Sequence, residues 1–393
     1  MKNLFSSGVI ALAVGATLTG CQAETTESGL PTDFDFQETQ EQAEPIDVIS
    51  VWAPSSVASS LTGISSVFES EYGVEIQFTE IELAEIDSRL QTGNYPDVFF
   101  GTHSWTADLA ESEAVSKLRT GILGDKIPEQ LLEAFSYQGD SFGVPISEQH
   151  VALVCNSELV PEQPSIDDLQ EIGLGVGLDS ELGDPYHLYP FMSSFGLSLS
   201  DPQNTEFDSD SGYEYASWMS SQGSELFDLN SDYTSVLEAF NSEQIGCWLT
   251  GPWAIASIEP ELIDSLVVYP VPAAGNVDSS ALVDVAGFFV AANSDDPVYA
   301  NRLVLEYFTR NTSQVAVAKS LSGVPAVETD DELFSMFRES VINATPTPSS
   351  ELMDQLWPLL GATQADLIRN DISSEEIWSG FVSELNALRS NQD

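Results

Sequence analysis

The sequence predicts an α/β protein, and three features support this fold class. From Ile46 to Phe100, apolar strands alternate with amphipathic helical stretches in a βαβα order, which is typical of a parallel sheet with helices on its faces. The stretch 236–257 reads as an amphipathic helix, an apolar strand at 245–249 and a Gly251-Pro252 turn into a new helix. At 393 residues, the chain is long enough for two lobes, each with its own core.

The N-terminal segment predicts export and a membrane anchor. Lys2 precedes an apolar run, 8–18, that is too short to span a membrane. Leu18-Thr19-Gly20-Cys21 resembles the lipobox of bacterial lipoprotein signals, in which the Cys is lipidated and becomes the mature N-terminus. We therefore expect 1–21 to be a lipoprotein signal peptide with Cys21 as its lipidation site; the alternative is an ordinary signal peptide with a chance Cys. Residues 22–45 are acidic and poor in apolar side chains, which predicts a disordered tether.

The first half of the folded region is read from its periodicity. The apolar face 57–68 predicts a helix that Ser55 or Ser56 caps, and Gln138-Gly139-Asp140 predicts the turn of a hairpin over 135–146. The expected strands are 46–52, 74–78 and 98–100, and a further helix covers 86–90.

The second half is read in the same way. Ser165 is expected to cap a helix at 166–171, and 295–309 is strongly amphipathic, with Ala300, Leu303, Val304, Tyr307 and Phe308 facing inward. The other expected helices are 191–195, 212–220, 233–240, 351–368 and 375–388, and the expected strands are 151–155, 267–271 and 283–292.

The charge balance is unusual: 63 Asp and Glu face 11 Lys and Arg, for a net charge of −52. Nucleic acid is excluded as a partner, because phosphate binding needs Lys and Arg patches. The acids are spread along the whole chain rather than clustered. This favours adaptation to a saline habitat, where salt screens self-repulsion, over a cationic substrate.

Cys155 and Cys247 both lie in predicted buried strands. In an exported protein they either form one disulfide or remain inert buried thiols. Sequence does not give their separation, so both alternatives stay open.

Trp253 is placed at the carboxyl end of a strand and the start of a helix, which is where ligands bind in open α/β sheets. A Trp there offers a flat apolar face and one N–H donor, and aromatic faces stack on sugar rings. The alternative is a Trp that only plugs the base of the turn.

Several segments resemble one family. "AFNSEQIGCWLTGPWA" resembles a stretch of the extracellular solute-binding proteins of bacterial ABC importers, family 1, typified by the maltose/maltodextrin-binding proteins. The segments "QTGNYPDVFFGTHSW", "FSYQGDSFGVPI", "SEQHVALVCN" and "GDPYHLYP" match further family motifs in the same order, so the resemblance covers roughly 46–390. Departures include Gln244 and Cys247-Trp248 within the first of these segments.

The resemblance implies a set of ligand-binding residues. In the family, the Trp of G-P-W and a second Trp in a late helix stack on the sugar. Ser104 and Trp105 stand where maltose binders often carry an acid and a base, and Gln149 stands where several relatives have Glu. Strand parity favours Gln149 over Glu148 as the residue facing the cleft. The expected ligand-binding residues are Ser55, Ser56, His103, Ser104, Trp105, Gln149, Asp184, Tyr186, Trp253 and Trp357.

The resemblance further implies a two-lobed periplasmic-binding-protein fold (type II-like), each lobe a mainly parallel sheet flanked by helices, with a hinge and an interlobe cleft. The expected N-terminal lobe is 46–148 plus 285–330, and the expected C-terminal lobe is 149–284 plus 331–393. The implied function is a monomeric, extracytoplasmic, lipid-anchored receptor that delivers a sugar or oligosaccharide to an ABC transporter permease, without a cofactor.

Two alternatives remain. One is a receptor of the same fold for another solute, such as a cation or metal; His103, His150 and His187 fall near the predicted cleft but lack a short metal-type spacing, so no metal is expected. The other is an extracellular glycan-acting enzyme. No hydrolase, metalloprotease or nucleotide-binding motif supports an enzyme.

Overall fold

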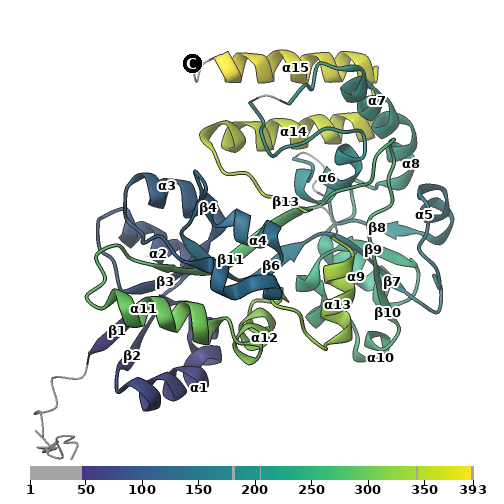
Figure 1. Ribbon diagram of the computed structural model, residues 1–393. Helices are drawn as coiled ribbons and strands as arrows, with labels where there is room; N and C mark the ends of the chain where they lie inside the picture. Colours follow the sequence, from purple (N-terminus) through teal and green to yellow (C-terminus); the bar gives the residue numbers. More distant parts are fainter. Residues whose placement is uncertain (1–46, 179–181, 204, 342–343, 391–393) are drawn as a thin grey trace, which may run out of the picture. The chain divides into compact units, whose positions relative to one another are not determined.

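The computed structural model describes residues 47–178, 182–203, 205–341 and 344–390. The predicted signal peptide, Cys21 and the tether lie outside these residues. Within them the α/β class is confirmed, because two mixed sheets are flanked by helices (Figure 1). In the same part of the chain, no helix has both the length and the apolarity needed to cross a membrane.

The larger sheet has seven strands among the described residues, in the order β12-β6-β11-β3-β1-β2, with β13 paired to β11. The strands β2, β1 and β3 run parallel, as the βαβα order predicted. The bounds are β1 (Val48–Ala53), β2 (Glu75–Glu80), β3 (Val98–Thr102), β6 (Gly143–His150), β11 (Leu282–Val290), β12 (Val324–Pro325) and β13 (Thr345–Pro346).

The prediction that each sheet is mainly parallel is wrong. Strand β11 is antiparallel to both β3 and β6, and β12 is antiparallel to β6. Parallel neighbours need a crossover connection, and the helical stretches between β1, β2 and β3 supply it. In the described part of the chain, the βαβα pattern of 46–100 therefore gives parallel pairs, whereas the later strands of this sheet pair mostly antiparallel.

The helices of the larger sheet bury the faces that periodicity predicted. Helix α1 (Ser55–Tyr72) buries Val57, Leu61 and Phe68, and it ends at Gly73, whose φ of 72° is the left-handed conformation that glycine adopts without strain. The predicted Ser caps are wrong. Pro54 occupies the cap position, so Ser55 and Ser56 already lie inside the helix and no side chain caps it.

The amphipathic stretch 295–309 is only partly a regular helix. Asp296 caps α11 (Pro297–Arg302), and the chain then widens into a π-helical segment, Leu303–Phe308. All five residues predicted to face inward are buried, so the apolar face is confirmed. Other elements here are α2 (Leu83–Leu90), α3 (Thr106–Glu111), α4 (Glu129–Ala134), α12 (Asn311–Ser320), the 3-10 segments His103–Trp105 and Thr120–Lys126, and the hairpin β4 (Ser136–Tyr137) to β5 (Asp140–Ser141). In that hairpin Asp140 already belongs to a strand, so the turn is Gln138-Gly139 alone.

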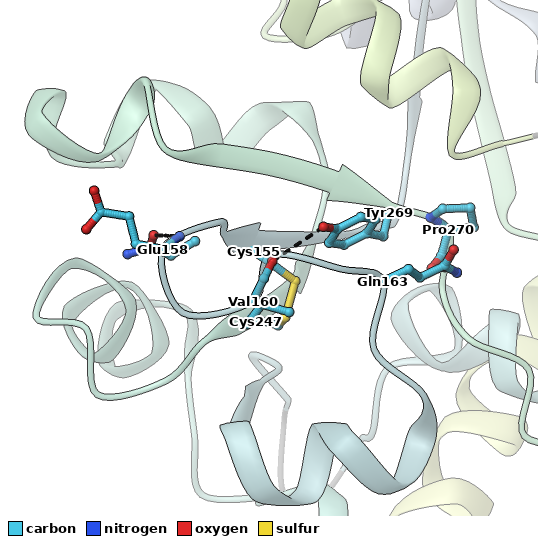
Figure 2. Close-up of a disulfide and its surroundings, with 8 residues drawn as sticks. Cys155, Glu158, Val160, Gln163, Cys247, Tyr269 and Pro270 are labelled. Carbon is cyan, nitrogen blue, oxygen red and sulfur yellow. Dashed lines mark hydrogen bonds between the residues drawn. A yellow bond between two sulfur atoms is a disulfide. The ribbon is translucent and has the colours of Figure 1, made fainter.

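The smaller sheet has the order β10-β7-β9-β8 among the described residues. Its bounds are β7 (Ala152–Asn156), β8 (Leu174–Gly175), β9 (Cys247–Thr250) and β10 (Leu266–Tyr269). Cys155 and Cys247 lie directly opposite each other on the antiparallel pair β7–β9, and they form a disulfide (Figure 2). The structure therefore has the first of the two alternatives for these cysteines.

The C-terminal helices build an aromatic core beside the smaller sheet. Trp378 is fully buried and packs on Phe207, Tyr215 and Phe381, and Trp218 and Trp248 are also buried. The helices are α5 (Ile166–Ile172), α6 (Pro185–Ser193), α7 (Asp210–Trp218), α8 (Ser224–Leu226), α9 (Tyr233–Asn241), α10 (Pro260–Ile263), α13 (Glu332–Glu339), α14 (Glu351–Arg369) and α15 (Ser374–Ser390), with a π segment Met219–Gly223 and a 3-10 segment Pro252–Ser257. Ser165 caps α5 in a capping box with Asp168, as expected.

Two of the three predicted lobe boundaries fall inside β6 and β11, the two long strands of the larger sheet that lead into or out of the smaller sheet's segment of chain. Gln149 on β6 pairs with Asp284 on β11 at the predicted crossing. The lobe bounds themselves remain a prediction.

Candidate functional site

The candidate site lies where β3, β6 and β11 run side by side. A cavity of about 250 Å³ opens there, and its lining mixes hydroxyl, amide and carboxyl groups with apolar walls. Gln149, and not its neighbour Glu148, is among the lining residues. The lining includes Phe100, Thr102, His103, Ser104, Ser147, Gln149, Asp284 and Leu321.

His103 is held by backbone on both of its ring nitrogens. Nδ1 accepts a hydrogen bond from the N–H of Val285 at 3.1 Å, and Nε2 lies 2.9 Å from the carbonyl oxygen of Thr347. This arrangement selects the Nε2-protonated tautomer, with Nε2–H donating to Thr347. His103 therefore fixes β11 and the connector to α14, and it offers the cavity a ring face. Beside it, the Ser104 hydroxyl is 2.7 Å from that of Thr102.

Gln149 and Tyr186 connect the cavity to α6. The Gln149 amide donates to the carbonyl of Leu321 at 2.9 Å, which leaves its side-chain oxygen as the acceptor that can face a ligand. The Tyr186 hydroxyl donates to the backbone carbonyl of Gln149 at 3.0 Å. The negative charge of Asp284 acts on the same Tyr186 hydroxyl.

Three rings gather around Tyr186. The centroids of Tyr186 and Trp253 are 6.2 Å apart, and the His187 ring stands edge-on to Trp253 at 5.9 Å. The Trp253 ring rests against Gly251, because a Cβ on that glycine would come within 2.1 Å of the indole. Glycine at this position thus lets the indole lie flat on the turn.

Asp184 holds two of these rings in position through hydrogen bonds to Tyr186 and His187. One carboxylate oxygen caps α6 by accepting from the N–H groups of Tyr186 and His187, both at 3.1 Å. The other lies 2.7 Å from Nδ1 of His187. Burial alone would raise the pKa of Asp184, but the hydrogen bonds from His187 and Tyr186 outweigh burial and lower it. Both oxygens are engaged, so Asp184 acts here by positioning Tyr186 and His187.

Buried groups with shifted pKa values lie on the opposite face of β6. Burial raises the pKa of Glu148 to about 7, with Arg338 opposing, and burial lowers the pKa of His150 to about 3.

Burial, followed by the negative charge of Asp284, also raises the pKa of Tyr186 well above its usual range. Tyr186 is therefore a neutral phenol that can donate a hydrogen bond.

The structure does not bring all predicted residues together. Ser55 and Ser56 are exposed at the start of α1, and Trp357 packs on the core beside the smaller sheet. Trp105 leans on Gly101 and lines a separate hollow of about 160 Å³ with Tyr95. In contrast, His103, Ser104 and Gln149 share the cavity, and Tyr186, Trp253 and Asp184 form the adjoining ring group.

Sequence reasoning missed Asp284 and gave His187 no role in the site. Asp284 had a signal, because it is a lone acid within the apolar strand 281–290. His187 lies one residue after Tyr186 on α6, and only the fold shows that its ring reaches Trp253. The described residues contain no group of three or more His, Cys, Asp or Glu arranged to hold a metal ion.

The arrangement suits a neutral, polyhydroxylated ligand. Hydroxyl and amide groups that donate and accept, one carboxylate acceptor and flat aromatic faces satisfy both polar and apolar sides of such a molecule.

The chain was compared with known proteins. A family model of bacterial extracellular solute-binding proteins matches residues 64–331. A maltotriose-binding protein of Pyrococcus abyssi is 20% identical over 305 residues, which are 68% of this chain and 64% of that relative. The match therefore spans less than two thirds of the relative's length.

Solved structures share the fold. The maltose-binding protein MalE of Listeria monocytogenes, solved with maltose, superposes with a TM-score of 0.75 at 16% identity, covering 88% of this chain and 99% of that one. The maltotriose-binding protein of Thermus thermophilus gives a TM-score of 0.65 at 19% identity, covering 88% and 100%.

These likenesses confirm the two-lobed binding-protein fold, although the sheets are mixed. The family model spans well over half of the sequence and includes β3, β6, β9 and β11, which carry or lead into the candidate site. The chain belongs to the family of bacterial extracellular solute-binding proteins.

Proposed function

We propose that this protein is a receptor that binds a sugar or oligosaccharide of the maltose or maltodextrin type and delivers it to the membrane permease of an ABC importer. The observation that carries the proposal is the ring group of Tyr186, His187 and Trp253 beside the polar cavity of Gln149 and Asp284. Sugars present apolar ring faces and polar edges, and this site offers a partner to each. The binding of maltotriose and maltose by the relatives supports the same ligand class.

The proposed mechanism is binding without chemistry. A ligand that touches Gln149 and Asp284 on the long strands, and also Tyr186 and Trp253, makes contacts from more than one element. Contacts that form only in the closed arrangement favour that state by the difference in affinity between the two states. Trp357, Ser55 and Ser56 are proposed as further contacts that closure would bring to the ligand, whereas Trp105 is proposed to remain in its separate hollow.

Membership of an extracellular family implies an extracytoplasmic location. We propose that lipidation at Cys21 anchors the protein to the membrane, that 22–45 serve as the tether, and that the receptor acts as a monomer. The disulfide supports export, because disulfides persist in oxidising compartments. The net charge of −52 supports a saline habitat.

The test is a titration of the purified domain from residue 46 onward with sugars and divalent cations, read by intrinsic Trp fluorescence and by calorimetry, at low and high salt. We expect a saturable response to one α-glucoside or related oligosaccharide, with stoichiometric binding and no release of a cleaved product. A response to a cation alone would favour the same-fold cation receptor, and turnover of a glycan would favour an enzyme.

Variants locate the site in the same titration. Trp253→Ala and Trp357→Ala should each weaken binding about tenfold or more, because each removes an aromatic face worth about 1.5 to 3 kcal/mol. Trp105→Ala is the matched comparison, because its indole lines the separate hollow. Unchanged affinity in both of the first two variants would place the ligand elsewhere.

A further inference from the structure

The few cations of this chain are not spread evenly. Residues 127–301 contain no Lys or Arg at all, whereas 117–126 and 302–319 together contain six of the chain's 11. Those two segments hold only two acids, Asp125 and Glu306. A chain with a net charge of −52 thus has a locally positive pair of segments.

The fold brings these two segments together. The 3-10 segment Thr120–Lys126 packs against the π segment Leu303–Phe308, and a hollow of about 760 Å³ opens between them. It is larger than the cavity of the candidate sugar site, and it shares no lining residue with that cavity. Its lining consists of Ile122, Leu123, Lys126, Leu305, Glu306, Thr309, Arg310, Asn311, Val327 and Glu328.

The hollow has an apolar floor and a charged rim. Leu123, Leu305 and Val327 are buried at the floor, whereas Ile122 on the rim is 58% exposed. The hollow therefore offers apolar side chains at its floor and one exposed apolar side chain at its rim.

The rim carries two cations, Lys126 and Arg310, and two acids, Glu306 and Glu328. Glu306 is paired with Arg302 at 3.3 Å, so its charge is already balanced. Lys126 and Arg310 are exposed, and neither forms an ion pair with a described carboxylate. Arg310 stacks on Tyr307 at 3.9 Å from the ring centroid, which holds its guanidinium in place beside the hollow.

We propose that this hollow, with Lys126 and Arg310 on its rim and Ile122 beside it, docks an acidic segment of a partner protein through apolar side chains flanked by Asp or Glu. Charge complementarity selects the partner: an acidic protein is repelled by nearly every other face of this molecule. Here, with Glu306 paired to Arg302, the two rim cations outnumber the one remaining acid, Glu328. The concave apolar floor favours a protein segment over a flat lipid surface, because it accepts protruding side chains. The inference does not depend on the identity of the solute.

The test uses the full chain and a defined probe, a fluorescein-labelled 14-residue peptide built from repeats of two Glu and one Leu, followed by fluorescence anisotropy. Measurements at 0.15 M and 1 M NaCl separate contact binding from long-range repulsion, because the Debye length falls from about 8 Å to 3 Å. The wild type should bind saturably. The double variant Lys126→Glu/Arg310→Glu should bind roughly tenfold more weakly or not at all, and Ile122→Ser should also weaken binding.

The matched control is Arg89→Glu/Arg369→Glu, which changes the net charge equally at two exposed ion pairs outside the hollow. It should bind like the wild type, and thermal unfolding should show that all variants fold. The proposal would be overturned if the control lost as much peptide affinity as the double variant, or if the wild type did not bind the peptide saturably. It would also be overturned if the wild type bound a peptide with Ser in place of Leu equally well. Binding of phosphatidylglycerol vesicles with the same variant dependence, without peptide binding, would replace it with a membrane-facing role.

Discussion

The Tyr186 hydroxyl donates a hydrogen bond to the backbone carbonyl of Gln149 at 3.0 Å, and so it ties α6 to the end of β6. The two residues lie 37 positions apart. Gln149 is on β6 of the larger sheet, and Tyr186 is on α6 beside the smaller sheet. A bond at this point couples the ring group to the polar cavity, because Gln149 lines the cavity and Tyr186 contacts Trp253.

Tyr186→Phe should therefore weaken sugar binding without unfolding the protein. The change removes one hydrogen bond worth about 0.5 to 1.5 kcal/mol, and it keeps the ring that packs on Trp253. We expect affinity to fall about two- to tenfold by calorimetry. Tyr213→Phe is the control, because its hydroxyl bonds only at the surface, to Asp208 and Ser379. Equal losses of sugar affinity in both variants would show that Tyr186 does not belong to the binding site.

Loss of the disulfide should destabilise the domain strongly. Cys155 and Cys247 are 92 residues apart, and a loop of that length gives about 4 to 5 kcal/mol of stabilisation by the chain-entropy model. Cys155→Ala/Cys247→Ala should lower the midpoint of urea unfolding accordingly, and reduction of the wild type should approach the same value. Free thiols in the native protein, measured by alkylation and mass, would contradict the bond.

Glu148→Gln should change how stability depends on pH. The carboxyl group of Glu148 has an ordinary pKa of 4.5 and a folded pKa of about 7, so the folded state binds more protons than the unfolded state between these values. The contribution of Glu148 to stability then falls as pH rises through this window, by roughly 2 to 3 kcal/mol between pH 5 and pH 8. The difference in unfolding free energy between variant and wild type should shift in favour of the variant by that amount.

His150 changes the free energy of unfolding with pH in the opposite direction to Glu148, and it is unchanged in both proteins that are compared. Its pKa falls from 6.5 to about 3 on burial, so the wild type loses stability as pH falls through that window. Between pH 4.5 and 6.5 the two groups partly cancel, and Glu148→Gln should expose the His150 dependence. A difference that does not change with pH would show that folding does not raise the pKa of Glu148.

Salt should raise the thermal stability of the domain. A net charge of −52 repels itself, and the Debye length shortens from about 30 Å at 0.01 M to about 3 Å at 1 M salt. The unfolding temperature should rise steeply over this range of NaCl, and much less in sucrose of equal osmolality. A flat response to NaCl would argue against salt adaptation.

Periodicity predicted the parts of this fold that depend on local pattern. The five inward residues of 295–309 follow from apolar spacing, and the structure buries all of them. The Ser55 and Ser56 caps failed because Pro54 takes the cap position, a competition between neighbours that spacing does not resolve. Strand direction failed for β11, since its nearly continuous apolar run is typical of a parallel strand, but here it reflects burial on both faces between antiparallel neighbours.

The site was predictable only where the local sequence around a residue indicates its position in the fold. Trp253 follows a strand and a Gly-Pro turn, and its place beside Tyr186 was foreseeable from the resemblance. Trp105 follows a strand equally well, but Gly101 lets its ring turn into a different hollow. Asp284 belongs to the site because it pairs with Gln149, 135 positions earlier in the sequence, where β11 meets β6. The local sequence pattern does not predict which distant strands pair.

The run from 127 to 301 without Lys or Arg also governs how the protein is cut. Trypsin cleaves after these residues, so digestion of the unfolded chain leaves one long fragment, from Ile127 to Arg302. That fragment carries all of the smaller sheet and both Cys155 and Cys247. Proteases of trypsin-like specificity therefore find no cleavage site anywhere in this half of the molecule, whether it is folded or not.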